Sequence, residues 1–512
     1  MDEIRKISVR LNDRSYEYDV YTLVIAFFQG VECHVFDPDT EIPGDTGLLV
    51  DVDIREAAVS VTLAETDGEG VSLAREVAIP EGGGRPAVKN RTKRTLYEML
   101  RDYCGRDLPW GSLTGIRPVK LAMEFLHGSP DDTAALSCRD VAERAKESMR
   151  RAYYTSPRKA DLAVRIALRE SDILSRIHPE RGFSLYVGIP FCPSICLYCS
   201  FSSSPLKVWE KKVDDYLDAL EKEIRSSGNC FPGRELQTVY IGGGTPTTLE
   251  PHQMDRLLRV IGETFDLSGV LEYTVEAGRP DSITREKLQV LKDHGISRIS
   301  INPQTMNQKT LDLIGRRHTV EQTREAFCLA RSMGFDNINM DLIVGLPGEG
   351  IDEVEHTMRE IEALDPDDIT VHALALKRAA RLALHMDEYE KISFRVSDDI
   401  MRRCEEGCEK LGMAPYYLYR QKNMAGNFEN VGYAKQGKEG LYNILIMEEV
   451  QCILACGASG STKIVYDDGR IERIENVKDI RSYLERIDEM ISRKEKIHGR
   501  INVGTEAHLQ MC

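Results

Sequence analysis

The stretch Tyr186–Phe201, YVGIPFCPSICLYCSF, joins an apolar run to three closely spaced cysteines. The run SLYVGI at 184–189 is rich in β-branched and aromatic residues, which predicts a buried strand. Cys192, Cys196 and Cys199 follow it directly, so we expect them on the loop after that strand. Thiolates are soft ligands that select zinc, copper(I) or iron–sulfur clusters. The stretch therefore predicts a metal centre at the end of a strand.

Six β-type runs follow one another between residue 183 and about residue 376, and helical patterns separate them. The runs are SLYVGI, LQTVYIGG, EYTVEAG, RISINPQ, NINMDLIVG and ITVHALAL. Alternating strands and helices imply a parallel sheet with right-handed crossovers. Six units predict an α/β fold with a partial (β/α)6 barrel rather than the full eight-unit barrel. In such barrels the chemistry gathers at the carboxyl ends of the strands.

The flanking regions have different patterns, which predict four parts in the chain. Residues 1–88 are expected to form an N-terminal β-rich domain, with the strands ISVRL, YTLVIAFF, LLVDVDI, VSVTLAE and REVAIP. Residues 89–178 read as a helical linker region, and residues 179–380 as the barrel. Residues 381–512 mix helices with short strands, so we expect a C-terminal α+β domain that serves as a substrate or lid domain.

Composition narrows the class of protein. The 512 residues carry a formal net charge of -16, which argues against binding nucleic acid or an anionic membrane. No apolar run approaches the roughly 20 residues of a membrane span, and the charged start MDEIRKISVRLND is unlike a signal peptide. We therefore expect a cytoplasmic protein. Thirteen cysteines in a large cytoplasmic chain indicate buried thiols together with a metal or redox site.

The number of cysteines in the triplet selects among metal centres. A structural zinc site uses four protein ligands, and no His or second CxxC pair lies nearby in the sequence to complete one. A four-iron cube held by three cysteines leaves one iron free to bind a small molecule, which makes it a reaction centre. The alternative is three buried thiols that share this spacing by chance.

CPSICLYC has the CxxxCxxC spacing of the radical S-adenosylmethionine (SAM) enzymes and resembles that superfamily. YVGIPFC is similar to YVHIPFC of the oxygen-independent coproporphyrinogen III oxidases and their relatives. The segments IGGGTPTTL, TVEAGRPDSIT, ISINPQTMNQKTLDLIGRRHT and NMDLIVGLPGE match that family in order and spacing. The regions outside the barrel most resemble the HemZ-type members, called coproporphyrinogen dehydrogenases.

The resemblance implies a [4Fe-4S] cluster on Cys192, Cys196 and Cys199, with SAM on the open iron. Tyr186 would lie close to the cluster and the substrate as a catalytic residue. The residues implied to bind SAM are Tyr186, Tyr198, Gly243, Gly244, Thr245, Glu276, Gln304, Arg316, Asp341 and Ala373.

Each implied site residue also has a plain structural interpretation. A glycine triplet is common in turns, and Tyr186 could simply pack in its strand. Glu276 could belong to a structural ion pair, and Arg316 could form a salt bridge with Asp341. Glu276, Gln304, Arg316 and Asp341 nevertheless follow successive predicted strands, which is where barrel chemistry is expected.

The resemblance implies oxidation of coproporphyrinogen III to protoporphyrinogen IX, with flavodoxin or ferredoxin as electron donor and the chain acting as a monomer. Arg117, Arg378 and Arg420 are candidate contacts to substrate carboxylates. Two departures matter: the oxidases usually carry Cys where this chain has Phe201, and His where it has Gly188. Phe201 is typical of the heme-chaperone branch, so a heme-binding trafficking protein with a [4Fe-4S] cluster is the alternative. Another radical SAM reaction on a tetrapyrrole is a third possibility.

Two further groups of residues invite interpretation. Cys404 and Cys408, then Cys452 and Cys456, form two CxxxC pairs that could hold a second cluster. Their neighbours look helical or turn-forming and apolar, so buried free thiols are the favoured interpretation. A tyrosine-rich segment could face the substrate or belong to the core; its members are Tyr416, Tyr417 and Tyr419.

Overall fold

The computed structural model describes residues 4–28, 30–66, 72–80, 82–115, 117–128, 137–199, 203–375, 396–421, 424–495 and 497. The chain divides into two compact units, one of residues 1–167 with 419–429 and one of residues 168–418 with 430–512. The four-part division at 88, 178 and 380 stays a prediction. No helix among the described residues is both long and apolar enough to cross a membrane.

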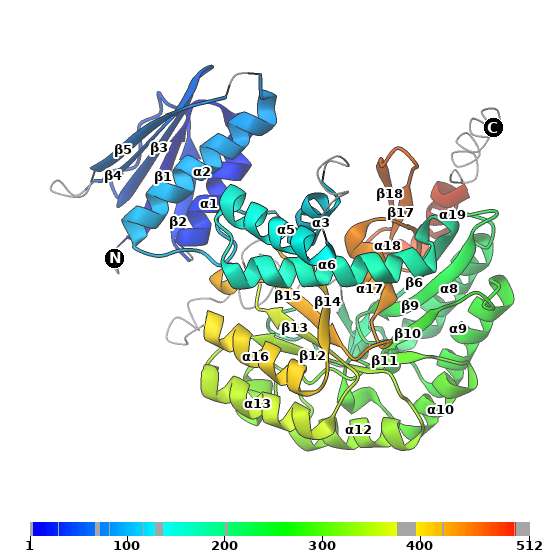
Figure 1. Cartoon of the computed structure of the whole chain (residues 1–512). Coiled ribbons are helices and arrows are strands. Elements are labelled where there is room, and N and C mark those ends of the chain that lie inside the picture. The colour runs from blue at the N-terminus through cyan, green and yellow to red at the C-terminus, as the bar shows by residue number, and fades with distance from the viewer. Residues whose placement is uncertain are drawn as a thin grey trace. The chain divides into compact units, whose positions relative to one another are not determined.

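The first unit contains a five-stranded sheet in the order β2-β1-β3-β4-β5. The strands are β1 (Lys6–Leu11), β2 (Glu32–Phe36), β3 (Leu48–Ile54), β4 (Ala58–Glu65) and β5 (Ser72–Ala78). Helices α1 (Glu17–Phe27) and α2 (Gly84–Cys104) pack on the sheet, and their apolar side chains share one core with it (Figure 1). The predicted helical region holds α3 (Pro118–His127), α5 (Cys138–Tyr153) and α6 (Pro157–Ile177).

One predicted strand of this unit is wrong. YTLVIAFF lies in helix α1, not in a strand. Val20, Leu23, Val24 and Phe27 are buried at i, i+3, i+4 and i+7, so they form the inner face of an amphipathic helix. The β-branched and aromatic residues suggested a strand, but packing against the sheet outweighs that local preference.

The second unit contains the predicted barrel. Its six parallel strands are β6 (Gly182–Ile189), β9 (Glu235–Gly243), β10 (Glu272–Glu276), β11 (Arg298–Ser300), β12 (Ile338–Val344) and β13 (Asp368–Ala373). Helices cover their outer side (Figure 1), namely α8 (Val213–Ser226), α9 (Pro251–Thr264), α10 (Arg285–Asp293), α12 (Val320–Ser332) and α13 (Ile351–Leu364). The partial (β/α)6 barrel is confirmed.

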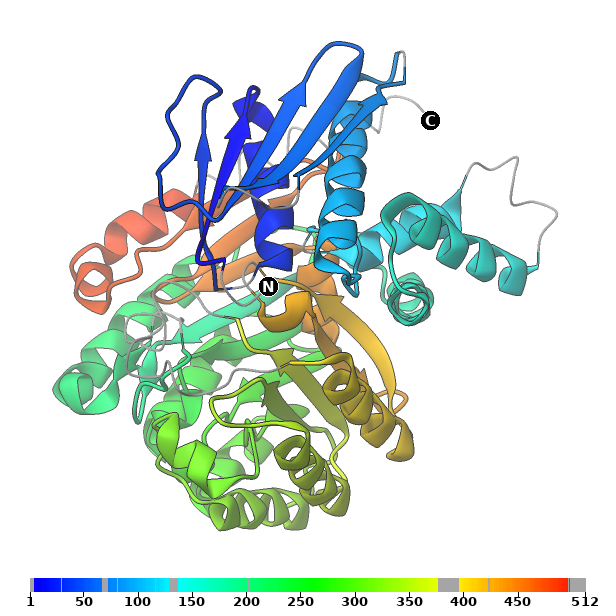
Figure 2. The same cartoon turned by 90° about the vertical axis from the view of Figure 1, so that its left-hand side faces the viewer.

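The C-terminal segment extends the same sheet at both edges to eleven strands. Strands β15 (Asn430–Ala434) and β14 (Ala414–Tyr419) continue it beyond β13. Strand β16 (Cys452–Cys456) pairs in parallel with β6, and β17 (Ser461–Val465) and β18 (Ile471–Glu475) follow as antiparallel strands. The helices that the structure describes in this segment are α16 (Asp398–Lys410), α17 (Leu441–Glu448), α18 (Ile480–Glu485) and α19 (Ile487–Glu495); Figure 2 shows the chain turned by 90° from the view of Figure 1.

A buried ion pair closes the amino end of the barrel. Arg298 and Asp368 are the first residues of β11 and β13, and Arg298 Nη2 lies 2.6 Å from Asp368 Oδ2. Tyr416 Oη donates a hydrogen bond of 2.8 Å to the same oxygen. Both charged side chains are almost fully buried. Because this polar cluster fills the amino end, the carboxyl end is left for the predicted chemistry.

Candidate active site

The three cysteines lie on one loop at the carboxyl end of β6. Cys196 is buried, whereas Cys192 and Cys199 are half-buried. The Cys199 N–H donates to the Cys196 carbonyl at 3.1 Å, and the Leu197 N–H donates to the Ile314 carbonyl at 2.9 Å. These bonds shape the loop and tie it to the segment after β11. The position predicted from the sequence is thus where the structure places the thiols.

The donor set fits an iron–sulfur cube better than a single ion. In the part of the chain that the structure describes, no three His, Cys, Asp or Glu side chains converge closely enough to hold one metal ion. A zinc ion needs such a common point, whereas a four-iron cube takes each thiolate on a different iron. Three thiols spread along one loop, beside two buried arginines, therefore match a cluster in their chemistry.

Arg316 contacts the cysteine loop through Tyr198. Its guanidinium is 3% exposed, and it donates to Tyr198 Oη at 3.1 Å and to the Gly278 carbonyl at 2.7 Å. Tyr198 lies between Leu197 and Cys199, and burial raises the pKa of its phenol well above the usual value. The Arg316 guanidinium donates to Tyr198 and Gly278 rather than to Asp341, so the alternative salt bridge with Asp341 is not formed.

The glycine loop lies directly against the start of the cysteine loop. The Gly244 N–H donates to the Ile189 carbonyl at 2.8 Å, and the Thr245 N–H donates to the Phe191 carbonyl at 2.7 Å. A Cβ atom at Gly244 would come within 2.6 Å of Phe191 O, so only glycine fits this close approach of two backbones. The N–H groups are committed, which leaves carbonyl oxygens as the groups that could accept from an amino group.

Thr245 also contacts a predicted cluster ligand. Its Oγ1 lies 3.4 Å from Cys192 Sγ. Gly243, the last residue of β9, has a φ of +109°, a conformation that glycine adopts readily. The structure therefore brings Gly243, Gly244 and Thr245 next to Cys192, as the sequence predicts for one site.

Glu276 ends β10 and faces the interior of the barrel. Tyr240 Oη donates to its Oε1 at 2.5 Å. Burial raises the pKa of the Glu276 carboxyl to about 7, and the nearby Asp341 acts in the same direction against the hydrogen bond from Tyr240. No lysine or arginine pairs with Glu276 among the described ion pairs, so its structural ion-pair interpretation is not supported.

Three tyrosine rings stack beside this carboxyl group. The rings of Tyr240 and Tyr442 lie 4.5 Å apart, and the Tyr186 ring lies 6.3 Å from each of them. Their interplanar angles of 15° to 22° make the three rings nearly parallel. Tyr186 comes from β6 and Tyr442 from α17, so the C-terminal segment contributes to the barrel interior.

Asp341, on β12, is held by a set of polar side chains. Asn302 Nδ2 and Asn339 Nδ2 each donate to its carboxylate at 2.8 Å, and His372 Nε2 lies 3.8 Å from its Oδ1. Burial alone would raise the pKa of Asp341, but the contacts with His372 and Asn339 outweigh it and lower the pKa. At neutral pH Asp341 is therefore ionised, whereas the Glu276 carboxyl is close to its pKa.

Gln304 and Ala373 complete the set of predicted residues. Gln304 has a φ of +68°, and its backbone bonds to Asp341 O at 3.0 Å and to the Ile343 N–H at 2.9 Å. Ala373 ends β13, and its N–H donates to Asn430 Oδ1 at 3.0 Å. Ala373 lies at the carboxyl end of β13, and Gln304 lies on the loop after β11. The backbone N–H groups of both are already used within the protein.

Four residues of the site were not identified from the sequence: Arg279, Tyr240, His372 and Tyr442. Strand alternation could have found Tyr240, because it pairs with Tyr186 across β6 and β9. His372 precedes the predicted Ala373, but period-two alternation places it on the opposite face from that residue. No local pattern identifies Tyr442, because α17 reaches the barrel through tertiary packing alone.

One prediction about the two CxxxC pairs is corrected. Cys452 and Cys456 lie on strand β16, not on a helix or turn, because the run CILAC pairs with β6 inside the sheet. Cys404 and Cys408 are buried in helix α16, as their pattern suggested. The described residues contain no cluster of ligands that joins the two pairs on one metal ion.

The tyrosine-rich segment belongs to the core rather than to a substrate surface. Tyr416 is fully buried on Asp368, and Tyr417 is buried with its Oη 3.3 Å from Thr370 Oγ1. Arg420 is also buried, and its N–H groups donate to the Leu113 carbonyl at 2.6 Å and to Asn427. These contacts make Arg420 a structural residue of the first unit rather than a free contact for a carboxylate.

Phe201 and Arg378 lie outside the described residues. Arg117 is the residue before helix α3. Gly188 lies in β6, where a Cβ atom would come within 3.3 Å of Ala458 O, so a side chain as large as His would require its neighbours to move.

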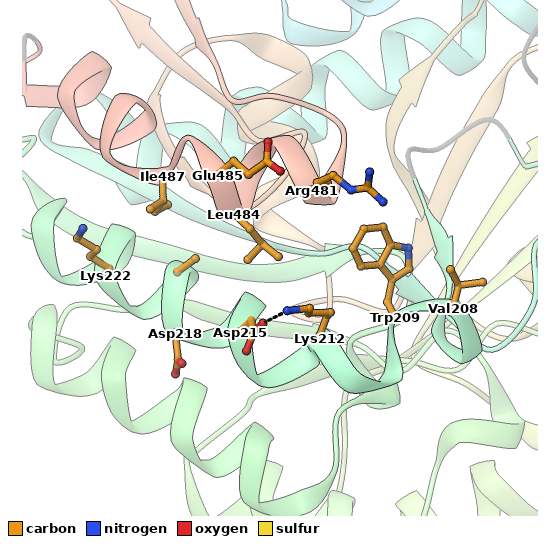
Figure 3. A pocket seen from close by; sticks show the side chains of 11 residues that line it. Val208, Trp209, Lys212, Asp215, Asp218, Lys222, Arg481, Leu484, Glu485 and Ile487 are labelled. Carbon is orange, nitrogen blue, oxygen red and sulfur yellow. Dashed lines mark hydrogen bonds and ion pairs between the residues drawn. The ribbon is translucent and has the colours of Figure 1, made fainter.

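A groove of about 790 Å³ lies on the outer side of the second unit (Figure 3). It runs between α7 (Leu206–Trp209) with the start of α8 and α18 with α19. Its lining residues are Val208, Trp209, Lys212, Asp215, Asp218, Ala219, Lys222, Arg481, Leu484, Glu485 and Ile487. None of them is a predicted site residue, so the groove is separate from the candidate active site.

Comparisons with known proteins identify the family. The radical SAM superfamily matches residues 186–361. The "Oxygen-independent coproporphyrinogen-III oxidase-like protein HemZ" of Bacillus subtilis is 39% identical over 414 residues, which cover 80% of this chain and 81% of that protein. The "Heme chaperone HemW" of Bacillus subtilis is 38% identical over 198 residues, 38% of this chain and 51% of that protein. A solved structure of coproporphyrinogen III oxidase HemN from Escherichia coli covers 63% of this chain and 73% of its own at 25% identity and a TM-score of 0.49.

The cysteine loop at the mouth of the barrel and the superfamily match define a radical SAM protein. Within that superfamily the chain belongs to the family of oxygen-independent coproporphyrinogen-III oxidase-like proteins, of the HemZ type. The cofactors of the superfamily are a [4Fe-4S] cluster and S-adenosylmethionine. The names of the similar proteins divide between an oxidase and a heme chaperone, which leaves the reaction as the question.

Proposed function

We propose that this protein catalyses the oxidative decarboxylation of coproporphyrinogen III to protoporphyrinogen IX. The observation that carries the proposal is that the thiol loop packs against the glycine loop at the end of β9, and that Glu276 and Tyr240 form a hydrogen bond beside that strand end. The extent of similarity supports it, because the oxidase-like relative is 39% identical over 80% of the chain, whereas a heme chaperone of Lactococcus lactis is 30% identical over 64% of it. A trafficking role would not by itself require a carboxyl group that titrates near neutral pH inside the barrel.

Cys192, Cys196 and Cys199 would hold the cluster, and the strand ends would hold SAM. When bound, these cofactors supply a 5'-deoxyadenosyl radical, which can take a hydrogen atom from an unactivated C–H group. The substrate positions would be the β-carbons of two propionate side chains. Each would lose one hydrogen atom and carbon dioxide to become a vinyl group, and one electron would pass to an acceptor.

The residues of the chain would bind and orient in this proposal. Carbonyl oxygens around Gly243 and Gly244 are suited to accept from the amino group of SAM, and the ionised Asp341 offers an acceptor for hydroxyl groups. Glu276 with Tyr240 could donate or accept a proton near neutral pH. Tyr186 and Tyr442 would exclude water from the reacting carbon.

We also propose an electron donor, an oligomeric state and a location for the protein. A low-potential protein such as flavodoxin or ferredoxin would reduce the cluster, and the chain would act as a monomer in the cytoplasm. We propose residues 381–512 as the part that covers the tetrapyrrole. The second unit does include β14 to β18 from this segment in the barrel sheet, which keeps it close to the site.

The experiment is anaerobic reconstitution with iron and sulfide, followed by SAM, a reductant and coproporphyrinogen III. Divinyl product and 5'-deoxyadenosine together support the proposal. SAM cleavage without vinyl product would assign a different substrate, and heme binding with neither would support the chaperone role. Glu276→Gln should keep the cluster and reduce turnover, whereas the surface variant Glu263→Gln should behave as the wild type.

A further inference from the structure

Arg279 is a buried arginine next to the cysteine loop that the predicted site does not include. It lies between β10 and the short helix η5 (Pro280–Ser282), and it is 3% exposed. Its carbonyl accepts from the Ser282 N–H at 2.9 Å and from Ser282 Oγ at 2.7 Å. These hydrogen bonds therefore fix the backbone at Arg279 independently of its side-chain contacts.

The two edges of the Arg279 guanidinium have different partners. Nε and Nη2 donate to the two oxygens of Asp281 at 3.0 and 2.9 Å. Nη1 points away from this pair, with Ser194 Oγ at 3.1 Å and Cys196 Sγ at 3.8 Å. A bidentate carboxylate fixes the plane of a guanidinium. Asp281 thus holds the Arg279 side chain so that its Nη1 faces the thiol of Cys196.

The charge around Cys196 is positive on this side. Asp281 offsets one cation, but Arg316 is a second buried guanidinium that contacts the same loop through Tyr198. His318 is fully buried beside them; burial, with Arg316 and Arg279, lowers its pKa to about 3, so it adds no charge at neutral pH. Of these two arginines, Arg279 is the one that donates to a cysteine sulfur.

We propose that Arg279 is a positioning residue that hydrogen-bonds the Cys196 thiolate and raises the reduction potential of the cluster bound there. This inference rests on the cysteine ligands assigned under the proposed function. Hydrogen bonds to cluster sulfurs and nearby positive charge stabilise the reduced cluster, which carries one more negative charge. A buried site strengthens both effects because water does not screen them.

The test is a redox titration of the reconstituted protein, followed by electron paramagnetic resonance of the reduced cluster. Arg279→Gln removes the charge but keeps a polar side chain. We expect the ratio of reduced to oxidised cluster at a fixed solution potential to fall about tenfold, equivalent to a midpoint about 59 mV more negative. An unchanged midpoint in a variant with full cluster occupancy would overturn the proposal.

Two further variants make the test specific. Arg279→Lys keeps the charge without the planar fork, so its midpoint should shift in the same direction by less. If Arg279→Gln does not fold, the Lys variant decides: a shift supports the proposal and no shift contradicts it. Arg256→Gln is the matched control, because Nε and Nη2 of Arg256 also donate to a carboxylate, at Oε2 of Glu221, but on the outer helices; its midpoint should equal that of the wild type.

The result is separable from the cofactor assignment. If the wild-type chain binds no iron on reconstitution, the ligand assignment fails and the potential is not at issue. If the wild type binds a cluster and Cys196→Ala does not, the assignment stands. The midpoint of Arg279→Gln then tests Arg279 alone.

Discussion

Glu276 and Tyr240 share a hydrogen bond of 2.5 Å inside the barrel. The two residues lie on neighbouring strands, β10 and β9. Burial keeps Glu276 protonated far above the pH at which an exposed glutamate ionises. The pair therefore places a group that titrates near neutral pH beside the end of β9, where Thr245 contacts Cys192.

The raised pKa of Glu276 has a consequence for stability. Between about pH 4.5 and pH 7 the unfolded chain loses the Glu276 proton while the folded chain keeps it, so folding stability falls as pH rises. Glu276→Gln removes this contribution. Relative to the variant, the wild type without cofactors should lose about 3 kcal/mol of unfolding free energy across this interval.

Urea unfolding of both proteins at pH 4.5 and pH 7.5 measures this difference. Glu263→Gln is the control, because Arg225 lowers the pKa of the exposed Glu263 and its titration lies below the interval. A constant difference between wild type and Glu276→Gln at the two pH values would show that Glu276 ionises normally.

Gly244 should not tolerate a side chain. Gly244→Ala places a methyl group 2.6 Å from the Phe191 carbonyl oxygen, and the backbone hydrogen bonds from Gly244 N–H to Ile189 and from Thr245 N–H to Phe191 hold the two segments together. We expect a loss of about 1–3 kcal/mol in unfolding free energy, and weaker cluster binding because the cysteine loop starts at Phe191. Gly269→Ala meets no atom closer than 3.8 Å and should change stability by about 0.5 kcal/mol or less. Equal stability of the two variants would contradict the close approach.

The pair of Arg298 and Asp368 allows a double-mutant cycle. Arg298→Met leaves the carboxylate of Asp368 buried with Tyr416 as its remaining partner, which should cost about 3–5 kcal/mol. Adding Asp368→Asn removes the unpaired charge, so the double variant should be more stable than Arg298→Met alone. Losses that simply add would show that the two side chains do not interact.

The sequence was most informative where one unit repeats. All six barrel strands and their helices were predicted, because each buried strand is apolar and each helix has an apolar stripe. The predicted thiol loop and Glu276 lie at the carboxyl ends of β6 and β10, because parallel strands bring their ends together, whereas Asp341 lies in the middle of β12. Helix α1 was mistaken for a strand, since local composition does not show what a segment packs against.

Tertiary contacts account for what was missed. Strand β16 pairs with β6 across 267 positions, as the bond between Ser184 and Gln451 illustrates, and no local signal reveals such a pairing. Tyr442 reaches the barrel interior in the same way. Arg279 stood inside a quoted motif, but its orientation toward Cys196 depends on the two-pronged contact with Asp281.

The central claim is that Cys192, Cys196 and Cys199 hold a [4Fe-4S] cluster with one iron open to SAM. The most direct measurement is the iron content and visible absorbance of anaerobically reconstituted wild type, Cys196→Ala and Cys404→Ala, with 5'-deoxyadenosine formed after SAM and reductant. We predict about four irons per chain and SAM cleavage in the wild type and in Cys404→Ala, and loss of both in Cys196→Ala. Full absorbance and SAM cleavage in Cys196→Ala would contradict the account.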